Sequence, residues 1–352
     1  MRIALIHYRL VRNGGLETRL LNYISHFSAL GHEVTVIVAK VDSSILLPKG
    51  VHLHHVNLSH VPKPLRQFFL DRALPDIMAA QKFDLSLSLG RTSHQQMVLC
   101  PGNHLGYLKA LGKWWRNPID LLNVHMDRRA FSNSSCILAA SQMMRNELVE
   151  LYAINASKIK VLGPPTDVAR FNNKGKEAKA HWRAVHGFSD RLPTVLFLST
   201  GNKLKGYSFV LQLMQELAGA PVELVIACMK PMHTDLPNVR YVGYAQRPEE
   251  LLWAADLLIL PSLYEAFGQV VTESLQCGTP VLISDKVGAK EIVDDNVGRV
   301  ISGTDVHVWK SAVLEMISQT WDIPSDVAQR HNLTLEQHCT RILELASELP
   351  AY

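Results

Sequence analysis

The chain has 352 residues, of which 47% are apolar and 19% are charged. This length exceeds what one hydrophobic core usually supports, so we expect two domains in an ordinary globular protein. No uncharged apolar run reaches the roughly 18 residues of a membrane-spanning helix, and the apolar start is too short for a signal peptide, so we expect a cytoplasmic protein. Five scattered cysteines argue against a disulfide framework or a zinc site.

The net charge of +4 is unevenly distributed along the chain. Residues 1–165 contain 19 Lys and Arg against 10 Asp and Glu, a net charge of +9, so the remaining residues carry −5. The first half is therefore the part that we expect to face an anionic partner. No long Lys/Arg-rich tract accompanies this charge, which argues against nucleic acid as that partner.

Both halves alternate short apolar strands with helical segments, which predicts a doubly wound parallel sheet in each. We place a first domain at 1–165, a linker and entry segment at 166–192, and a second domain at 193–330. A last helix over 333–349 can pack back on the first domain. In the first half we expect strands near 3–6, 34–38, 51–56, 85–89, 97–100, 137–140 and 159–162, with helices near 16–27, 65–81 and 142–152. In the second half we expect strands near 195–198, 222–227, 239–242, 257–260, 281–283 and 300–301, with helices near 267–277 and 306–318.

The stretch 256–284 contains the strongest functional pattern. It predicts a strand, a loop carrying Glu265, a helix carrying Glu273 and a second strand. Ligands of parallel sheets lie beyond the carboxyl ends of the strands, where the helix also presents free amides. The two carboxylates, about 9 Å apart along the helix axis, suit two sets of hydroxyls on one long ligand. The alternative is a pair of solvated acids that favour the helix dipole.

Two glycine-containing loops follow strands and suit phosphate. The loop 199–206 carries Lys203 and Lys205, whose ammonium groups can meet a diphosphate, although either lysine can also be solvated. The pair Gly14 and Gly15 permits positive φ and close approach of the backbone to a ligand, although such a pair is often only a turn. Glu17, directly after it, is either a first-turn acid or an acceptor contact.

Three further places carry weaker patterns. His104 and its neighbour Asn103 follow an apolar strand and can contact a sugar or a developing oxyanion, although a structural role is the default for one of 16 histidines. Arg170 points into the site or is solvated. The segment 105–119 mixes Tyr and Trp with Lys and Arg, which suits an anionic bilayer interface or, alternatively, a helix with buried tryptophans.

With these residues in place, the sequence resembles the GT-B glycosyltransferases of family 4. Their E-x-F-G-x-x-x-x-E signature is matched by Glu265, Phe267, Gly268 and Glu273, and the closest likeness is to bacterial enzymes of lipopolysaccharide core and envelope glycan synthesis. Two departures are Lys203 at the place of the usual arginine near Lys205, and Pro165-Thr166 in place of an Asn-Gly in the linker.

The resemblance implies two Rossmann-like domains that face a central cleft, with the acceptor on the first and a nucleotide sugar on the second. It implies that Glu265 and the amides of Ala266, Phe267 and Gly268 hold the donor sugar and that Glu273 binds the ribose. The diphosphate would be met by Lys205, by Lys203 and, across the cleft, by the Gly14 and Gly15 backbone.

The implied activity is retaining transfer of a hexose from a nucleotide sugar, with a UDP-sugar favoured and a GDP-sugar as the alternative. No D-x-D pair is present to hold a metal-bound diphosphate, so we expect no metal and no other cofactor. The expected acceptor is a glycan or glycolipid at the inner face of the cytoplasmic membrane, which residues 105–119 would contact. A sugar-nucleotide epimerase, a DNA-directed sugar transferase and a non-catalytic nucleotide-binding subunit are the other readings.

Overall fold

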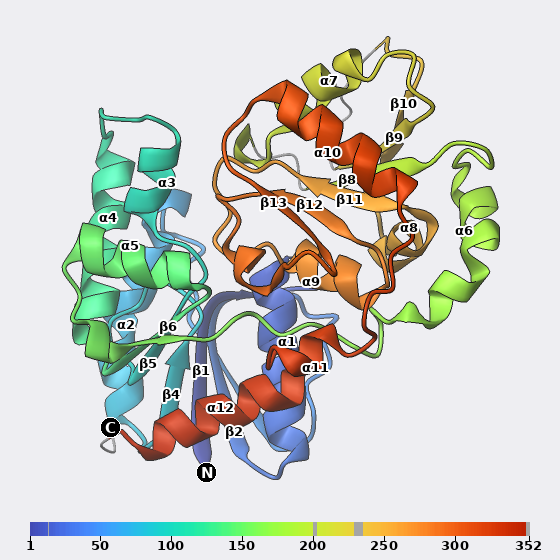
Figure 1. Ribbon diagram of the computed structural model, residues 1–352. Helices are drawn as coiled ribbons and strands as arrows, with labels where there is room; N and C mark the ends of the chain where they lie inside the picture. Colours follow the sequence, from blue (N-terminus) through green and yellow to red (C-terminus); the bar gives the residue numbers. More distant parts are fainter. Residues whose placement is uncertain (13, 200–202, 229–234, 350–352) are drawn as a thin grey trace. The chain divides into compact units, whose positions relative to one another are not determined.

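The apolar runs of both halves form parallel sheets covered by helices (Figure 1). The computed structural model describes residues 1–12, 14–199, 203–228 and 235–349. Unit 1 comprises Met1–Pro165 and helix α12 (Leu335–Ser347), and unit 2 comprises Thr166–Thr334. The central strands are buried along their whole length because helices cover both faces, as is usual for parallel sheets. The predicted fold class is confirmed.

Unit 1 contains one parallel sheet in the order β3-β2-β1-β4-β5-β6-β7, counted over its described residues. Its strands are β1 (Arg2–Leu10), β2 (Glu33–Val41), β3 (Val51–His55), β4 (Leu85–Ser88), β5 (Met97–Cys100), β6 (Cys136–Ala139) and β7 (Ile159–Val161). Its other helices are α1 (Gly15–Ala29), η1 (Lys63–Leu65), α2 (Arg66–Ala79), α3 (His104–Ala110), α4 (Pro118–Asn133), α5 (Gln142–Tyr152) and η2 (Ala156–Lys158). The order reverses between β1 and β4, so unit 1 has its topological switch point there.

The C-terminal helix α12 belongs to the core of unit 1, where it lies along α1 (Figure 1). Tyr23 Oη of α1 and His338 Nε2 of α12 are 2.5 Å apart, and His338 Nδ1 lies 2.9 Å from the carbonyl oxygen of Gly163. Burial lowers the pKa of His338 to about 3, so the ring is neutral. Ile342 and Leu345 are buried in the same core. Helix α12 is thus anchored in unit 1, against residues that are remote from it in sequence.

Unit 2 contains a parallel sheet in the order β10-β9-β8-β11-β12-β13, again counted over the described residues. Its strands are β8 (Thr194–Leu198), β9 (Glu223–Ala227), β10 (Val239–Gly243), β11 (Leu257–Leu260), β12 (Val281–Ser284) and β13 (Gly298–Ile301). Its helices are η3 (Asn173–Ala178), α6 (Lys179–His186), η4 (Lys203–Lys205), α7 (Tyr207–Glu216), α8 (Pro248–Ala254), α9 (Gln269–Gln276), η5 (Gly288–Ile292), α10 (Val306–Ser318) and α11 (Val327–Arg330). The switch point of unit 2 lies between β8 and β11.

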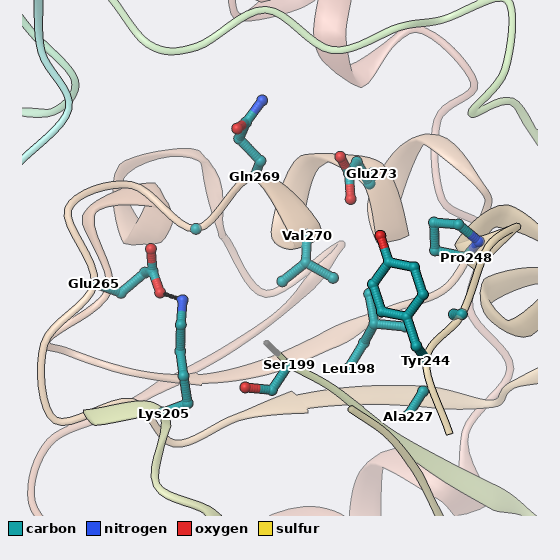
Figure 2. Close-up of a pocket in the computed structure, with 12 residues that line it drawn as sticks. Leu198, Ser199, Lys205, Ala227, Tyr244, Pro248, Glu265, Gln269, Val270 and Glu273 are labelled. Atoms are coloured by element: carbon teal, nitrogen blue, oxygen red, sulfur yellow. Dashed lines mark ion pairs between the residues drawn. The ribbon is translucent and has the colours of Figure 1, made fainter. Parts of the chain in front are cut away.

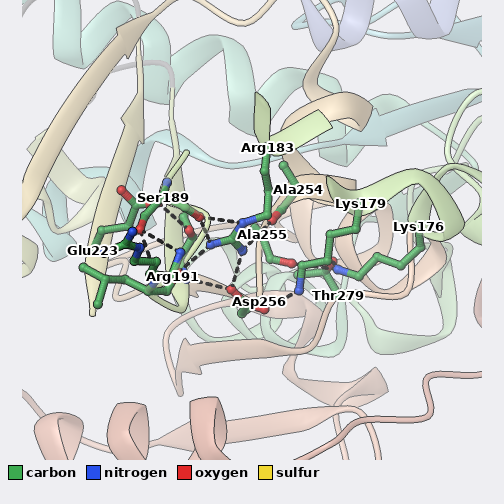
Figure 3. Close-up of polar contacts among 12 residues, drawn as sticks. Lys176, Lys179, Arg183, Ser189, Arg191, Glu223, Ala254, Ala255, Asp256 and Thr279 are labelled. Carbon is green, nitrogen blue, oxygen red and sulfur yellow. Dashed lines mark hydrogen bonds and ion pairs between the residues drawn. The ribbon is translucent and has the colours of Figure 1, made fainter. Parts of the chain in front are cut away.

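The segment expected as a linker, 166–192, is folded onto unit 2 by a polar network (Figure 3). Asp256, just before β11, accepts hydrogen bonds from Arg183 Nη1 at 2.9 Å and from the Thr194 amide at 2.7 Å, and it is also ion-paired with Lys179. Lys176 Nζ donates to the carbonyl oxygen of Ala255 at 2.7 Å. These bonds fix the entry to the strand that leads to the candidate site.

Two sequence expectations need correction. The helix expected over 267–277 begins only at Gln269, because Gly268 adopts a left-handed conformation with φ of 93°. A core-facing helix over 105–119 is wrong, because α3 ends at Ala110 and Trp114 is 88% exposed. The five cysteines are buried and unbridged. Among the described residues, we find no helix with both the length and the apolar character needed to cross a bilayer.

Candidate functional site

A pocket of about 360 Å³ opens beyond the carboxyl ends of β8 and β11, at the switch point of unit 2 (Figure 2). Parallel α/β sheets bind ligands at such points because the loops from neighbouring strands diverge there. The pocket is lined by Leu198, Ser199, Lys205, Ala227, Tyr244, Ala245, Pro248, Glu265, Gly268, Gln269, Val270 and Glu273. The sequence prediction that the ends of these strands form a site therefore matches a real concavity in unit 2.

Lys205 and Glu265 face each other across one side of this pocket and form an ion pair (Figure 2). Their side chains are 22% and 16% exposed, so the pair is shielded but reachable from the pocket. Burial lowers the pKa of Lys205 to about 8, so its ammonium group loses a proton more readily than that of a surface lysine. The structure thus brings together a cation that suits phosphate and a carboxylate that suits hydroxyl groups.

Glycine at position 206 allows Lys205 to reach the end of β11. A Cβ on Gly206 would overlap the carbonyl oxygen of Pro261, and its φ of 76° also favours glycine. Next to it, the Leu263 amide donates to the Leu204 carbonyl oxygen at 2.7 Å. The close approach of the two loops therefore places Lys205 opposite Glu265.

The loop after β12 holds the backbone of Glu265 from the other side. The Glu265 amide donates to the Lys286 carbonyl oxygen at 3.0 Å, and the Gly288 amide donates to the Glu265 carbonyl oxygen at 2.9 Å. A Cβ on Gly268 would lie 2.9 Å from Val287 Cγ1, so only glycine fits where the chain turns into α9. The carboxylate of Glu265 is consequently carried by a fixed backbone, which is what precise ligand placement requires.

Glu273 lies one helical turn into α9, on the face that lines the pocket with Gln269 and Val270 (Figure 2). Burial raises the pKa of Glu273 to about 7, and the nearby charge of Glu249 acts in the same direction. The carboxyl group therefore changes its ionisation near neutral pH. The two glutamates predicted from the sequence share one pocket, with Glu265 at the ion pair and Glu273 nearer Tyr244 and Pro248.

Several predicted site residues of unit 2 do not line the pocket. Phe267 is buried in the core and its carbonyl oxygen accepts from the Ala289 amide at 2.7 Å. Ala266 also lies outside the lining, so of the three predicted amide donors, Ala266, Phe267 and Gly268, the pocket lining includes Gly268. Arg170 is turned toward α8, where its Nε donates to Glu249 Oε2 at 2.8 Å. Its charge acts on Glu273 only through space, where it lowers that pKa against the larger effect of burial.

The predicted phosphate loop, 199–206, lies partly among the described residues. Residues 200–202 lie outside the described residues. Lys203 begins η4, but its side chain also lies outside the described part of the chain. Ser199, the last described residue before this interval, lines the pocket. The role expected of Lys203 stays a prediction.

In unit 1, the Gly14–Gly15 turn begins α1 as predicted. Gly14 is the N-cap residue with φ of 122°, and Gly15 is the first helical residue. Glu17 is 4% exposed, is ion-paired with Arg9 and lies 3.6 Å from His7 Nε2. Burial opposes its ionisation, but the nearby His7 and Arg9 outweigh that effect and lower the pKa of Glu17 to about 2. These contacts favour the first-turn acid over the acceptor contact.

Asn103 and His104 of unit 1 stabilise the start of α3, after β5. Asn103 is the N-cap of α3, where its Oδ1 accepts from the Gly106 amide at 2.6 Å. His104 Nε2 lies 3.0 Å from Asp120 Oδ1, and the His104 amide donates to Asp127 Oδ2 at 2.8 Å. Both side chains thus have local structural roles, and the catalytic role of His104 stays an untested prediction.

The pocket also contains residues that the sequence reasoning missed. Gln269 and Val270 line it from the first turn of α9, and Pro248 lines it from the start of α8. The spacing of Gln269 and Val270 to Glu273 places all three on one face of a helix, which was the signal available in the sequence. Pro248 gave no such signal.

Comparison with known proteins connects this geometry to a family. Residues 13–170 match the family described as Glycosyltransferase Family 4, and residues 178–333 match the family described as Glycosyl transferases group 1. The chain carries a Glycosyltransferase Family 4 domain followed by a Glycosyl transferases group 1 domain. The group 1 match contains the whole Lys205, Glu265 and Glu273 pocket, so this family region and the pocket coincide.

Relatives and solved structures agree with this family assignment. A "probable transglycosylase" of Burkholderia thailandensis is 29% identical over 358 residues, which cover 99% of this chain and 97% of the relative. The structure of WaaG, a glycosyltransferase involved in lipopolysaccharide biosynthesis, superposes with a TM-score of 0.75 at 17% identity and covers 97% of this chain and 95% of its own. HepE of Anabaena, in complex with UDP and glucose, gives a TM-score of 0.75 at 16% identity, with 99% and 100% covered. The two superpositions confirm the GT-B fold.

Proposed function

We propose that this glycosyltransferase is a retaining, metal-independent hexosyltransferase that moves a sugar from a nucleotide sugar to a hydroxyl of a glycan or glycolipid, in the synthesis of lipopolysaccharide or another envelope polysaccharide. The observation that carries the proposal is the presence of Lys205, Glu265 and Glu273 in one pocket at the switch point of unit 2. A volume of about 360 Å³ lies within the range of small-molecule sites. The envelope acceptor is supported by the likeness to WaaG.

In this proposal the donor breaks the ion pair between Lys205 and Glu265. The ammonium of Lys205 then binds the diphosphate, and the carboxylate of Glu265 accepts hydrogen bonds from the sugar hydroxyls. Glu273, farther along α9, accepts from the ribose hydroxyls. Because each charged group leaves one partner for another, the pocket need not expose an unpaired charge when the donor enters.

The transfer needs no nucleophile from the protein. The acceptor oxygen forms its bond to the anomeric carbon on the face from which the diphosphate departs, and the acceptor proton passes to a departing phosphate oxygen. Lys205 stabilises the negative charge that develops on the diphosphate, which a fixed cation in a shielded pocket does well. This route retains the anomeric configuration and uses a lysine where other enzymes use a metal ion.

The decisive experiment measures sugar transfer and nucleotide binding in two variants. Glu265→Gln should lower kcat by about 10²-fold or more, because the carboxylate acts on the reacting sugar. Glu273→Ala should mainly weaken nucleotide binding. Glu315→Gln, which alters an exposed ion pair with Arg299 in the same unit, is the matched control and should behave as wild type. Normal transfer by both pocket variants would refute the proposed site.

Donor and reaction class are tested together. Thermal shifts with UDP-, GDP- and ADP-sugars should be largest for the UDP-sugar, a choice supported by HepE with bound UDP. Incubation with the nucleotide sugar alone should produce no isomer. An isomer formed without acceptor would identify a sugar-nucleotide epimerase in place of a transferase.

A further inference from the structure

The connection between α3 and α4 in unit 1 exposes two adjacent tryptophans. Trp114 is 88% exposed and Trp115 is 70% exposed, and their rings meet edge to face at 6.2 Å. Tryptophan is one of the most costly side chains to leave in water, because each ring can bury about 150–250 Å². Two exposed indole rings in the connection between two helices therefore need an explanation.

The tryptophans belong to a larger apolar surface. Single exposed apolar residues are normal, but a cluster within a short segment marks an interaction site. We call this cluster the α3–α4 surface; its exposed apolar residues are Tyr107, Leu111, Trp114, Trp115, Ile119 and Leu121.

The exposed charges of the same region are all positive. Lys109, Arg116 and Arg128 are exposed, whereas the two acids of residues 104–129 are buried. Asp120 is paired with Lys113 Nζ at 2.5 Å and with His104, and Asp127 accepts from Arg91 Nε at 2.5 Å. Both carboxylates are thereby neutralised inside the fold, so a partner meets indoles and cations without an exposed carboxylate.

We propose that the α3–α4 surface docks on an anionic lipid bilayer. Indole rings favour the headgroup region, where the apolar ring is buried and the N–H stays hydrated. Each Lys or Arg near an anionic leaflet adds about 1 kcal/mol, and neither signal alone gives firm attachment. We infer lipid as the occupant because exposed indole rings and exposed cations, found together in one short segment, match the headgroup region of an anionic leaflet.

This inference extends the proposed function, since a glycolipid acceptor is held in a membrane, but it is testable without catalysis. The full chain is sedimented, with no donor or acceptor, with vesicles of phosphatidylcholine alone and of phosphatidylcholine mixed with phosphatidylglycerol. Wild type should bind the anionic vesicles and release them at high salt. Trp114→Ser with Trp115→Ser should weaken binding at least about tenfold, and Lys109→Glu with Arg116→Glu should do the same.

The matched control removes exposed groups elsewhere on unit 1. Leu46 is 90% exposed and Lys49 is also exposed, so Leu46→Ser with Lys49→Glu removes one exposed apolar side chain and reverses one exposed charge outside the α3–α4 surface. It should bind as wild type does. Absence of wild-type binding to anionic vesicles, or equal losses in the control and the tryptophan variants, would overturn the inference. Normal vesicle binding with no sugar transfer would instead count only against the proposed function.

Discussion

The carboxylate of Glu17 occupies the space that a side chain on Gly14 would need. A Cβ on Gly14 would overlap Glu17 Oε2, and the φ of 122° at Gly14 is one that other residues rarely adopt. Glu17 is held there by its ion pair with Arg9 of β1. The turn at the start of α1 is therefore locked between a strand and a helix, and its glycine is required for two separate reasons.

Gly14→Ala should lower the free energy of unfolding more than an ordinary glycine substitution. The added methyl group meets the Glu17 carboxylate, and the backbone is strained at about 1–3 kcal/mol. Thermal or urea unfolding measures the loss.

Gly31→Ala is the control for this prediction. Gly31 also has a positive φ, 78°, but nothing lies within 4 Å of an added Cβ, so its substitution reports backbone strain alone. The double variant Gly14→Ala with Glu17→Ala should recover part of the loss. Equal destabilisation by Gly14→Ala and Gly31→Ala would show that the contact with Glu17 contributes nothing.

The Lys205 and Glu265 ion pair should show coupling in a double-mutant cycle. Either single alanine variant leaves a charge in a shielded pocket without its partner, whereas the double variant leaves none. We expect each single variant to lower the melting temperature and the double variant to lower it by less than the sum. Additive losses would show that the pair does not stabilise the donor-free protein.

The fold could be predicted from the sequence because its strands are apolar runs with clear ends. Residues 142–152 and 306–318 were predicted with the bounds that the structure has for α5 and α10. The sequence of 105–119 left two interpretations open, because aromatic residues mixed with bases suit a buried helix and an exposed loop equally well. Only the tertiary structure shows that Trp114 is 88% exposed among the described residues.

The candidate site was predictable where local spacing determined it and not where packing did. Glu265 and Glu273 followed from a strand, loop and helix pattern, and both line the pocket. Arg170 was uncertain because its direction depends on Glu249, which is remote in sequence and holds it through a hydrogen bond at 2.8 Å. The contribution of Pro248 depends likewise on the placement of α8.

The pH dependence of kcat/KM for the donor should be a narrow bell. Burial raises the pKa of Glu273 to about 7, and its ionised form is the better acceptor for ribose hydroxyls, so the rate should rise with pH through this value. Burial lowers the pKa of Lys205 to about 8, and only its protonated form attracts the diphosphate, so the rate should fall above that value. A UDP-sugar is the suitable probe, because its diphosphate diester does not titrate in this range.

Two variants assign the limbs of this profile. Glu273→Gln should remove the acid limb and keep the alkaline one, and Lys205→Arg should move the alkaline limb beyond the measured range because arginine stays protonated. The assignment fails if the acid limb persists unchanged in Glu273→Gln.

Asp256 should be a main determinant of the stability of unit 2, because it joins the segment 173–192 to the entry of β11 (Figure 3). Asp256→Asn keeps the shape but removes the charge that Arg183 and Lys179 share. We expect a loss of about 2 kcal/mol in the free energy of unfolding, less than for a fully buried pair because the Asp256 side chain is 23% exposed.

The contribution of Asp256 should also depend on pH in a defined direction. Burial opposes the ionisation of this carboxyl group, but its bonds to Lys179, Thr194 and Arg183 together outweigh burial and lower its pKa. Its stabilisation is therefore present above the pKa of the unfolded chain, about 4. It should be lost as the pH falls through the lower folded value. The difference in stability between wild type and Asp256→Asn should therefore be constant near neutral pH and shrink in acid. Glu315→Gln, in the exposed pair with Arg299, is the control and should change the free energy of unfolding by less than about 0.5 kcal/mol at any pH. If Asp256→Asn lost no more than this, the network would not hold the segment in place.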